Sequence, residues 1–379
     1  MSNKVPQIRF KGYSDAWVQR EFVKMVDRVS ESSTAELPRV EFEDLISGMG
    51  RLNKDVTKPG DTRSGIHFVA GDVLYGKLRP YLNNWLHATF EGLALGDFWV
   101  FRTKEMLESS FLYALIQAPK YQQAANLSSG TKMPRSDWKT VSTTEFLVPE
   151  KQEQQKIGEL FNNLDNLIAA NQRKLDLLKE QKKGYLQKMF PKNGAKVPEL
   201  RFAGFADDWE ERKLSDIADR FDNLRVPITA SDRKSGDTPY YGANGIQDYV
   251  EGFTHDGEFI LVAEDGANDL KNYPVQYVNG KVWVNNHAHV LQGKKTITDN
   301  KFLMNSIKNF NIEPFLVGGG RAKLNADVMM KLNVLLPTFE EQEKIGLFFK
   351  QLDDTITLHQ RKLDLLKEQK KGLLQKMFV

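Results

Sequence analysis

The clearest pattern in this 379-residue chain is a heptad spacing of apolar positions in two long stretches, residues 153–190 and 341–378. Apolar residues recur there every three and four positions, which places them along one side of an α-helix and is typical of a coiled-coil seam. The other positions are mostly charged or polar, as on a solvated helix face. We therefore expect two long helices. The predicted seam residues are Ile157, Phe161, Leu164, Ile168, Leu175 and Leu178 in the first, and Ile345, Phe349, Leu352, Ile356, Leu363 and Leu366 in the second.

The two stretches are copies of each other. They align without a gap at an offset of 188 residues, and 27 of 38 positions are identical. Each helix needs a partner because a single amphipathic helix leaves its apolar stripe exposed, and the other copy is the obvious one. We expect an antiparallel pairing in which Asn171 and His359 lie near mid-helix and fix the register. A generic oligomerisation coiled coil is the alternative interpretation of the seam.

A second repeat lies ahead of each globular part. Residues 6–17 (PQIRFKGYSDAW) match residues 198–209 (PELRFAGFADDW) at an offset of 192, so the chain is two half-molecules of one plan. The predicted domains are an N-terminal lead-in segment (1–16), body 1 (17–149), a central helix (150–190), a linker that repeats the lead-in segment (191–208), body 2 (209–337) and a C-terminal helix (338–379).

Within the two bodies the pattern changes to short apolar runs bounded by Gly, Pro and polar residues, which predicts strands with a few short helices. A turn and a strand are predicted at 68–75, strands at 98–101, 259–263 and 282–284, and helices at 105–117 and 299–307. The fold class is therefore α+β. It consists of two globular domains of mixed strands and short helices, separated by two long antiparallel helices, with pseudo-two-fold symmetry.

The two bodies have a common frame. The spacing from Gly130 to Asp137 recurs from Gly320 to Asp327, and each body ends in an apolar run that leads into its helix through Pro149 or Pro337. Otherwise their sequences differ greatly. A shared frame with divergent inserts suggests that the two bodies recognise two different things.

Charge does not by itself indicate a nucleic-acid ligand. The net charge is +3, with 16 basic against 16 acidic residues in body 1 and 15 against 17 in body 2. Any DNA contact by the bodies must therefore come from local clusters of Lys and Arg. The absence of cysteine excludes disulfides and thiolate metal sites, and a cytoplasmic protein is expected. No apolar run suits a membrane span, and the N-terminus does not look like a secretory signal.

Taken together, these features resemble the specificity subunits of type I restriction–modification systems. The resemblance covers essentially all residues. It rests on the repeated helices, the Pro-x-x-x-Glu-Gln sequences at their starts, the repeated Arg-Phe-x-Gly segments and, most specifically, the tail LDLLKEQKKGLLQKMF. Residues 71–82 look like the family's strand-loop element in body 1. Residues 259–268 and 284–290 look like the corresponding elements in body 2.

The resemblance implies a subunit with no catalytic site of its own. Two target-recognition domains would each read one half of a bipartite, asymmetric site in double-stranded DNA, and the antiparallel helices would set the spacer. The implied partners are two methyltransferase subunits that modify adenine and restriction (motor-nuclease) subunits that cut unmodified DNA. No cofactor and no membrane are implied.

The sequence also lacks motifs of those catalytic partners. It has no Asn/Asp-Pro-Pro-Tyr-type loop for a flipped adenine and no Walker A sequence. His287 and His289 could ligate a metal. Without cysteine or a supporting carboxylate pattern, a strand with two ordinary histidines is favoured, and no metal site is predicted. Two other classes stay open: a scaffold whose coiled coil joins two binding bodies without DNA, and a metal nuclease with an unfamiliar site.

Candidate DNA-contacting residues are polar and basic clusters in predicted loops, because Lys and Arg suit phosphates while Arg, Asn and similar side chains suit base edges. In body 1 these are Lys77, Arg79, Tyr81, Asn83, Asn84, Lys132 and Arg135. In body 2 they are Arg225, Arg233, Lys234, Tyr241, Asn244, Lys271, Asn272, Tyr273, Arg321 and Lys323.

Overall fold

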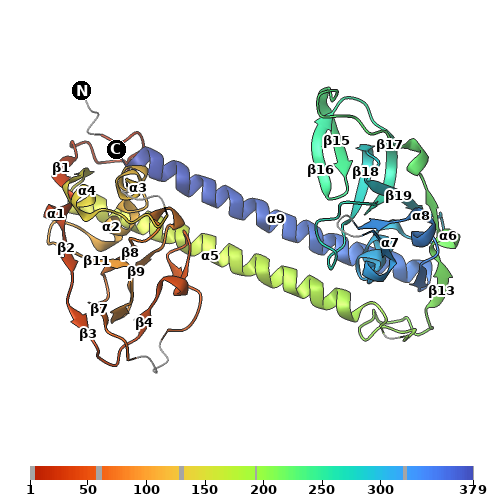
Figure 1. Ribbon diagram of the computed structural model, residues 1–379, viewed down its shortest axis with the longest axis horizontal. Helices are drawn as coiled ribbons and strands as arrows, with labels where there is room; N and C mark the ends of the chain where they lie inside the picture. The colour runs from red at the N-terminus through yellow and green to blue at the C-terminus, as the bar shows by residue number, and fades with distance from the viewer. Residues whose placement is uncertain (1–4, 57–61, 128–131, 193, 319–321, 379) are drawn as a thin grey trace. The chain divides into compact units, whose positions relative to one another are not determined.

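The computed structural model describes residues 5–56, 62–127, 132–192, 194–318 and 322–378 (Figure 1). The chain forms two compact units. Unit 1 comprises Met1–Lys174 together with His359–Val379, and unit 2 comprises Leu175–Leu358. Each unit therefore contains one body and a part of each long helix. Within the described residues, no helix combines the length and apolarity needed to cross a membrane.

The two copies of the sequence repeat form the long helices α5 (Lys151–Lys188) and α9 (Phe339–Met377). In unit 1, Asp165 of α5 accepts a hydrogen bond from Lys370 of α9, and Phe161 packs on Phe378, so the two segments are antiparallel. In unit 2, Lys182 of α5 donates to Asp353 of α9. These two ion pairs are repeat equivalents of each other.

The ion pairs, rather than the polar mid-helix residues, carry the register that the sequence assigned to Asn171 and His359. Asn171 donates to the carbonyl of Leu167 in its own helix at 2.8 Å, and Nδ1 of His359 is buried without a hydrogen-bond partner among the described residues. Nine of the twelve predicted seam residues are buried, and Leu352, Ile356 and Leu366 are half-buried. Lys182 and Lys370, which interrupt the heptads, are therefore part of the interface.

Body 1 contains two four-stranded sheets, with strand orders β3-β7-β10-β4 and β2-β11-β8-β9. All pairs in them are antiparallel except β10 with β4. The strands are β1 (Val18–Glu21), β2 (Val26–Val29), β3 (Ser32–Ser33), β4 (Arg39–Val40), β5 (Leu45–Ile46), β6 (Arg51–Leu52), β7 (Gly65–Phe68), β8 (Val73–Gly76), β9 (Trp85–His87), β10 (Gly92–Ala94), β11 (Phe98–Thr103) and β12 (Glu145–Val148).

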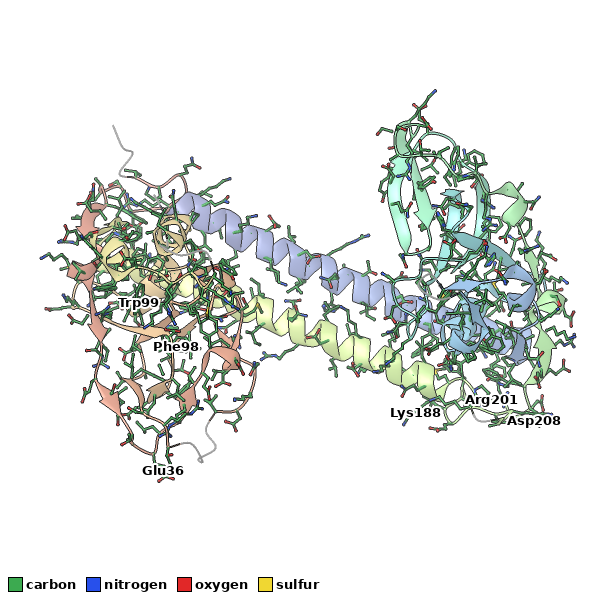
Figure 2. The ribbon with its side chains drawn as sticks, in the orientation of Figure 1. Glu36, Phe98, Trp99, Lys188, Arg201 and Asp208 are labelled. Carbon is green, nitrogen blue, oxygen red and sulfur yellow. The ribbon has the colours of Figure 1, made fainter. Side chains whose placement is uncertain are left out.

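The sheet that contains β11 separates two apolar clusters. Successive side chains of a strand point to opposite faces, so Phe98 packs with Val40 and Phe68 on one side, while Trp99 packs with Phe101 on the other (Figure 2). Helix α2 covers this sheet. The short helices of body 1 are α1 (Phe22–Met25), α2 (Ser109–Leu115), α3 (Pro119–Asn126) and α4 (Trp138–Thr143), with 3₁₀ turns η1 (Phe42–Asp44) and η2 (Pro80–Leu82).

Body 2 is built on one six-stranded sheet with the order β14-β19-β17-β18-β15-β16, in which only β15 and β18 are parallel. Helix α7 packs on β17, β18 and β19. The elements of body 2 are β13 (Glu210–Lys213), α6 (Leu214–Ile217), β14 (Ala218–Arg220), η3 (Asp222–Leu224), β15 (Ser235–Gly242), β16 (Gly245–Val250), β17 (His255–Ala263), β18 (Val275–Val284), β19 (Ala288–Gly293), α7 (Asn300–Lys308), η4 (Glu313–Phe315), β20 (Leu316–Val317), β21 (Lys323–Leu324), α8 (Ala326–Met329) and β22 (Asn333–Leu336).

Each body is closed by the same two-stranded antiparallel ribbon, which joins its first strand to its last: β1 with β12 and β13 with β22. The end of each lead-in segment therefore lies beside the start of a long helix. Each lead-in segment also reaches the C-terminal end of a helix in its own unit. The N–H of Ile8 donates to the carbonyl of Lys376 at 3.2 Å, and that of Leu200 donates to Lys188 at 2.9 Å (Figure 2 labels Lys188 and Arg201).

Candidate nucleic-acid interface

The two bodies have one backbone arrangement in common, which we call the junction. In body 1 the N–H of Lys77 donates to the carbonyl of Asp97 at 2.9 Å, and the N–H of Ser136 donates to the carbonyl of Lys77 at 2.8 Å. A β-bridge between Leu78 and Arg135 completes it. The junction therefore connects the end of β8, the start of β11 and the segment before α4.

Body 2 repeats the junction bond for bond. Glu264 N–H donates to the carbonyl of His287 at 2.8 Å, Leu324 N–H donates to that of Glu264 at 2.7 Å, and Asp265 bridges Lys323. The equivalent residues lie at offsets of 187 to 190. The backbone is thus the same in both bodies, although the side chains attached to it differ.

The junction of body 1 exposes mainly positive charge. Asp97 accepts a hydrogen bond from Arg135 at 3.0 Å and lies 3.7 Å from the ammonium of Lys77, so one carboxylate faces two cations. The predicted cluster that contains Lys77 and the one that contains Arg135 are therefore brought together at Asp97. Asp97 itself was absent from the prediction.

The junction of body 2 has the opposite sign at its centre, where Glu264 replaces Lys77. Glu264 accepts hydrogen bonds from Arg225 at 2.7 Å and from Lys323 at 2.8 Å. Burial alone would raise the pKa of Glu264, but hydrogen bonds from Lys323 and Arg225 lower it on balance. His287 replaces Asp97 and lies 2.6 Å from Asp265 through Nδ1.

Beside this junction, Asp222, Glu264 and His289 place ligand-type atoms within 4.8 Å of one another. Both ring nitrogens of His289 lie within hydrogen-bond distance of oxygen atoms, the Asp222 carboxylate at 2.7 Å and the Leu324 carbonyl at 2.8 Å. Burial would raise the pKa of Asp222, yet the hydrogen bond and charge of His289 lower it overall. Arg225 forms ion pairs with both Asp222 and Glu264, and Lys323 with Glu264, so these carboxylates belong to an ion-pair network.

After the body 1 junction, residues 79–83 form a short strap around η2. Arg79 and Asn83 at its two ends have left-handed backbones, with φ of 48° and 56°. Arg79 is exposed, and Tyr81 is 57% exposed. Asn83 is half-buried. The strap thus carries exposed candidate side chains, Arg79 and Tyr81, at the edge of the junction.

Three candidates are buried or held by other side chains, which disfavours direct contact with a ligand. Asn84 is only 6% exposed, and Tyr273 is 4% exposed with its hydroxyl donating to the carbonyl of Ala263. Arg225 is held inside the Glu264 network with only 15% of its side chain exposed. Polar character in a loop sequence therefore did not guarantee exposure.

The other candidates of body 2 fall into two groups. Asn244, at the β15–β16 turn, is bonded to the segment that follows the junction, donating to Gly266 and accepting from Asn268, both at 2.9 Å. Arg233 and Lys234 precede β15, so its eight residues place them roughly 26 Å from Asn244 at 3.3 Å per residue.

The remaining candidates take up varied positions. Lys132, Lys271 and Asn272 are exposed, Tyr241 is half-buried, and Arg321 lies outside the described residues.

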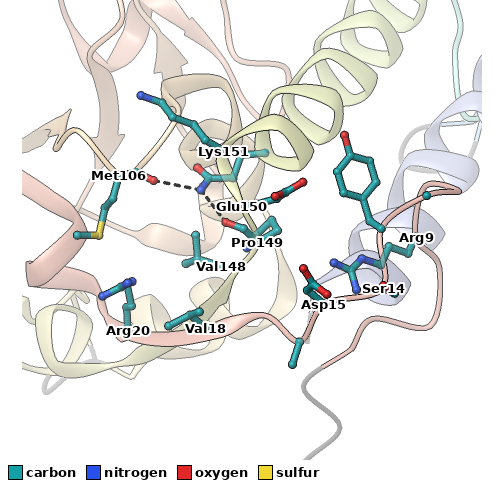
Figure 3. A pocket seen from close by; sticks show the side chains of 14 residues that line it. Arg9, Ser14, Asp15, Val18, Arg20, Met106, Val148, Pro149, Glu150 and Lys151 are labelled. Carbon is teal, nitrogen blue, oxygen red and sulfur yellow. Dashed lines mark hydrogen bonds between the residues drawn. The ribbon is translucent and has the colours of Figure 1, made fainter.

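A cavity of about 380 Å³ opens where the lead-in segment meets the start of α5 (Figure 3). Arg9 donates two hydrogen bonds to the fully buried Glu153 at 2.7 and 2.8 Å. Gln154 donates to the carbonyls of Met106 and Pro149, shown as dashed lines. A cavity of about 450 Å³ in unit 2 has the same construction, with Arg201 bonded to Glu341 and Gln342 bonded to Ile297 and Pro337.

Some exposed residues are also identical at equivalent positions of the two units. Asp15 and Arg20 line the first cavity, and their repeat equivalents Asp207 and Arg212 line the second. On the helices, Leu177 is 52% exposed and its equivalent Leu365 is 59% exposed. Retention of exposed apolar and charged residues inside one chain indicates a surface with the same task in both units.

A family model described as the type I restriction modification DNA specificity domain matches residues 88–180 and 206–368. The chain belongs to this family. It is 44% identical over 154 residues to a protein named as a type I restriction enzyme specificity subunit in Haemophilus influenzae, covering 41% of this chain and 39% of that protein. It is 20% identical over 336 residues to the type I restriction enzyme MjaVIII specificity subunit of Methanocaldococcus jannaschii, covering 80% and 75%.

The fold is that of specificity subunits. The crystal structure of the type I restriction–modification system S subunit from M. genitalium matches 99% of both chains with a TM-score of 0.71 at 16% identity. The predicted α+β class, with two globular domains and two long helices, is confirmed. The first family match spans part of body 1 and part of α5, and the second spans all of body 2 and part of α9, which follows the internal repeat.

Proposed function

We propose that this specificity subunit reads a bipartite DNA site, one half with each body, and holds two methyltransferase subunits and, through the assembled complex, restriction subunits. One observation carries the proposal: the two bodies have the same junction backbone but different charges on it. Lys77, Asp97 and Arg135 stand where Glu264, His287 and Lys323 stand in body 2. Equal frames with unequal side chains suit two readers of unlike base sequences.

Retention of exposed residues supports the presence of two copies of one partner. Binding of DNA half-sites with different sequences does not explain why these exposed residues are identical in the two units. The identical pairs are Leu177 and Leu365, Asp15 and Asp207, and Arg20 and Arg212. Binding of two identical protein subunits does explain it, because each subunit needs the same surface. Exposed leucines on the long helices suit an apolar helix of the methyltransferase subunit.

Co-expression with a compatible methyltransferase subunit and genome-wide mapping of modified adenines tests the reading function. We expect a gapped motif with two defined, unlike halves. Binding of the complex to a duplex with that motif should weaken steeply with added salt, because Lys and Arg contacts release counterions from phosphate. A contiguous motif, or salt-independent binding, would contradict the proposal.

The partner surface has its own test. Changing both Leu177 and Leu365 to Asp should reduce the number of methyltransferase subunits bound, as measured by native mass spectrometry. Leu270→Asp is the matched control, since Leu270 is also exposed, at 37%, but lies in a loop of body 2. If the double variant and the control bind the same number of methyltransferase subunits, these leucines are not part of the docking surface.

A further inference from the structure

The strap of body 1 has a counterpart in body 2, and the two differ at one informative position. Counting from the junction, Arg79 corresponds to Gly266, since Leu78 and Asp265 form the equivalent bridges. Both residues are left-handed, with φ of 48° for Arg79 and 69° for Gly266. The frame thus requires a left-handed residue at this point in both bodies.

Glycine is the residue that this conformation favours, because a Cβ atom clashes with the backbone there. Arg79 carries that Cβ atom and also precedes Pro80, whose ring further restricts the backbone of the residue before it. Body 1 therefore has arginine at a position where body 2 has glycine, the residue that suits this backbone conformation. Strain of this kind is retained at sites where the side chain has a task.

The strap is firmly anchored despite the strain. The N–H of Arg79 donates to the carbonyl of Pro134 at 2.7 Å, and the N–H of Gly76 donates to the carbonyl of Asn84 at 2.7 Å across its base. The carbonyl of Asn83 accepts from the N–H of Gly48 at 2.9 Å. The backbone at Arg79 is thus fixed in place before any ligand arrives.

The guanidinium has no task inside the protein that would explain the strain. Arg135 and Lys77, its neighbours at the junction, share Asp97, whereas within the described part of the chain no hydrogen bond or ion pair involves the Arg79 side chain. Tyr81, two residues on, is also exposed. An exposed guanidinium on an anchored backbone, beside the cations Lys77 and Arg135, is available to a ligand with paired acceptors.

We infer that Arg79 is a specificity-determining residue that reads one guanine, through its O6 and N7 atoms in the major groove, in the half-site bound by body 1. Arginine presents two parallel N–H groups that match this acceptor pair, which no other base presents. The inference rests on the proposed function and assigns a single base contact within it. Gly266 has no side chain, so body 2 makes no equivalent contact from this position.

The decisive variant is Arg79→Gly, which installs the residue of body 2 and relieves the strain. Complexes of the methyltransferase with wild-type or variant subunit are compared by mapping modified adenines. We expect the variant to lose one guanine from one half of the motif and to keep every other position. In binding assays, replacing that guanine by adenine should weaken wild-type binding about 10- to 100-fold and leave the variant unaffected.

Thermal unfolding of the variant keeps the test interpretable, since its melting temperature should equal or exceed that of the wild type. Lys104→Ala, at a basic residue that bonds the carbonyl of Val23, is the control and should leave the motif unchanged. An unchanged motif for Arg79→Gly overturns the inference, as does uniformly weaker methylation at all sites, which would mean phosphate contact only. A wild-type complex without a gapped motif would instead refute the proposed function.

Discussion

Lys308 and Gln117 occupy the same place in the two units but differ in charge. Gln117 follows α2 and accepts a hydrogen bond from Lys370 at 2.6 Å, beside Asp165. Lys308 ends α7 beside the equivalent pair of Lys182 and Asp353, where burial and the charge of Lys182 lower its pKa from the ordinary value of 10.5. Unit 2 thus holds two ammonium groups against one carboxylate.

We predict that Lys308→Gln stabilises unit 2 by on the order of 1 kcal/mol at pH 7, by removing a like-charge repulsion and supplying an acceptor to Lys182. The folded wild type binds the Lys308 proton more weakly than the unfolded chain does. Its free energy of unfolding should therefore rise with pH as the pH passes from the lowered pKa towards 10.5, and the variant should lack this rise.

Denaturant unfolding at pH 7 and pH 10 measures both effects. Gln117→Lys is the reciprocal control and should destabilise unit 1, since it adds the second cation there. A less stable Lys308→Gln protein at pH 7 would show that the ammonium group contributes more through Asp353 than it loses to Lys182.

At the scale of elements, each long helix contains two glycines with opposite surroundings. A Cβ atom at Gly158 would lie 2.1 Å from Oγ of Ser110 in α2, and the equivalent Gly346 faces Oδ1 of Asp299. Gly184 and Gly372 have nothing within 4 Å. The first pair therefore permits close approach of a short helix, and the second pair only lowers helix propensity.

Alanine should thus have opposite effects at two glycines of the same helix. We predict that Gly184→Ala stabilises the protein by about 0.5–1 kcal/mol through helix propensity. Gly158→Ala should destabilise it by about 1–3 kcal/mol through overpacking against Ser110. Urea unfolding of both variants tests this, and the pair serve as controls for each other; effects of the same sign would disprove the packing argument.

The long helices were predictable because their pattern is local and repeated, whereas the junction was not. Heptads specify a helix within a few turns, and α5 and α9 match the predicted stretches. The predicted helix at 105–117 is confined to Ser109–Leu115, with a turn before it. The junction joins residues 77, 97 and 135, and such pairing depends on packing that no local pattern records.

Side-chain exposure was similarly hidden from the sequence. Asn84 and Tyr273 are polar but buried, and Arg225 is neutralised by Glu264, a residue 39 positions away. The matching spacings that end the two bodies were the one available signal for the junction, since Arg135 and Lys323 lie within them.

At the scale of the whole molecule, each body is joined to the rest by repeated connections: its closing ribbon, its lead-in segment and its helix. We predict that replacing residues 17–149 by a second copy of 209–337 gives a folded subunit, because both ribbons present the same ends. With the methyltransferase subunit, it should modify a motif made of two identical halves, as seen by adenine mapping.

The boundaries supply the control for this exchange. A replacement that starts after Glu21 would join half of one closing ribbon to half of the other, and it should lower the melting temperature. A motif that keeps the original body 1 half after the full exchange would show that the bodies do not read the halves.

The ion pairs and the twelve identical residues from Arg173 to Gly184 and from Arg361 to Gly372 have an evolutionary consequence. Under the proposed function, genetic recombination inside such a block would exchange an entire reading module and leave the subunit contacts unchanged. A host lineage would then acquire a new target in a single crossover, without any adjustment of the methyltransferase and restriction subunits. Recognition could then diversify while assembly stays constant, because the proposal assigns the two tasks to separate parts of one polypeptide.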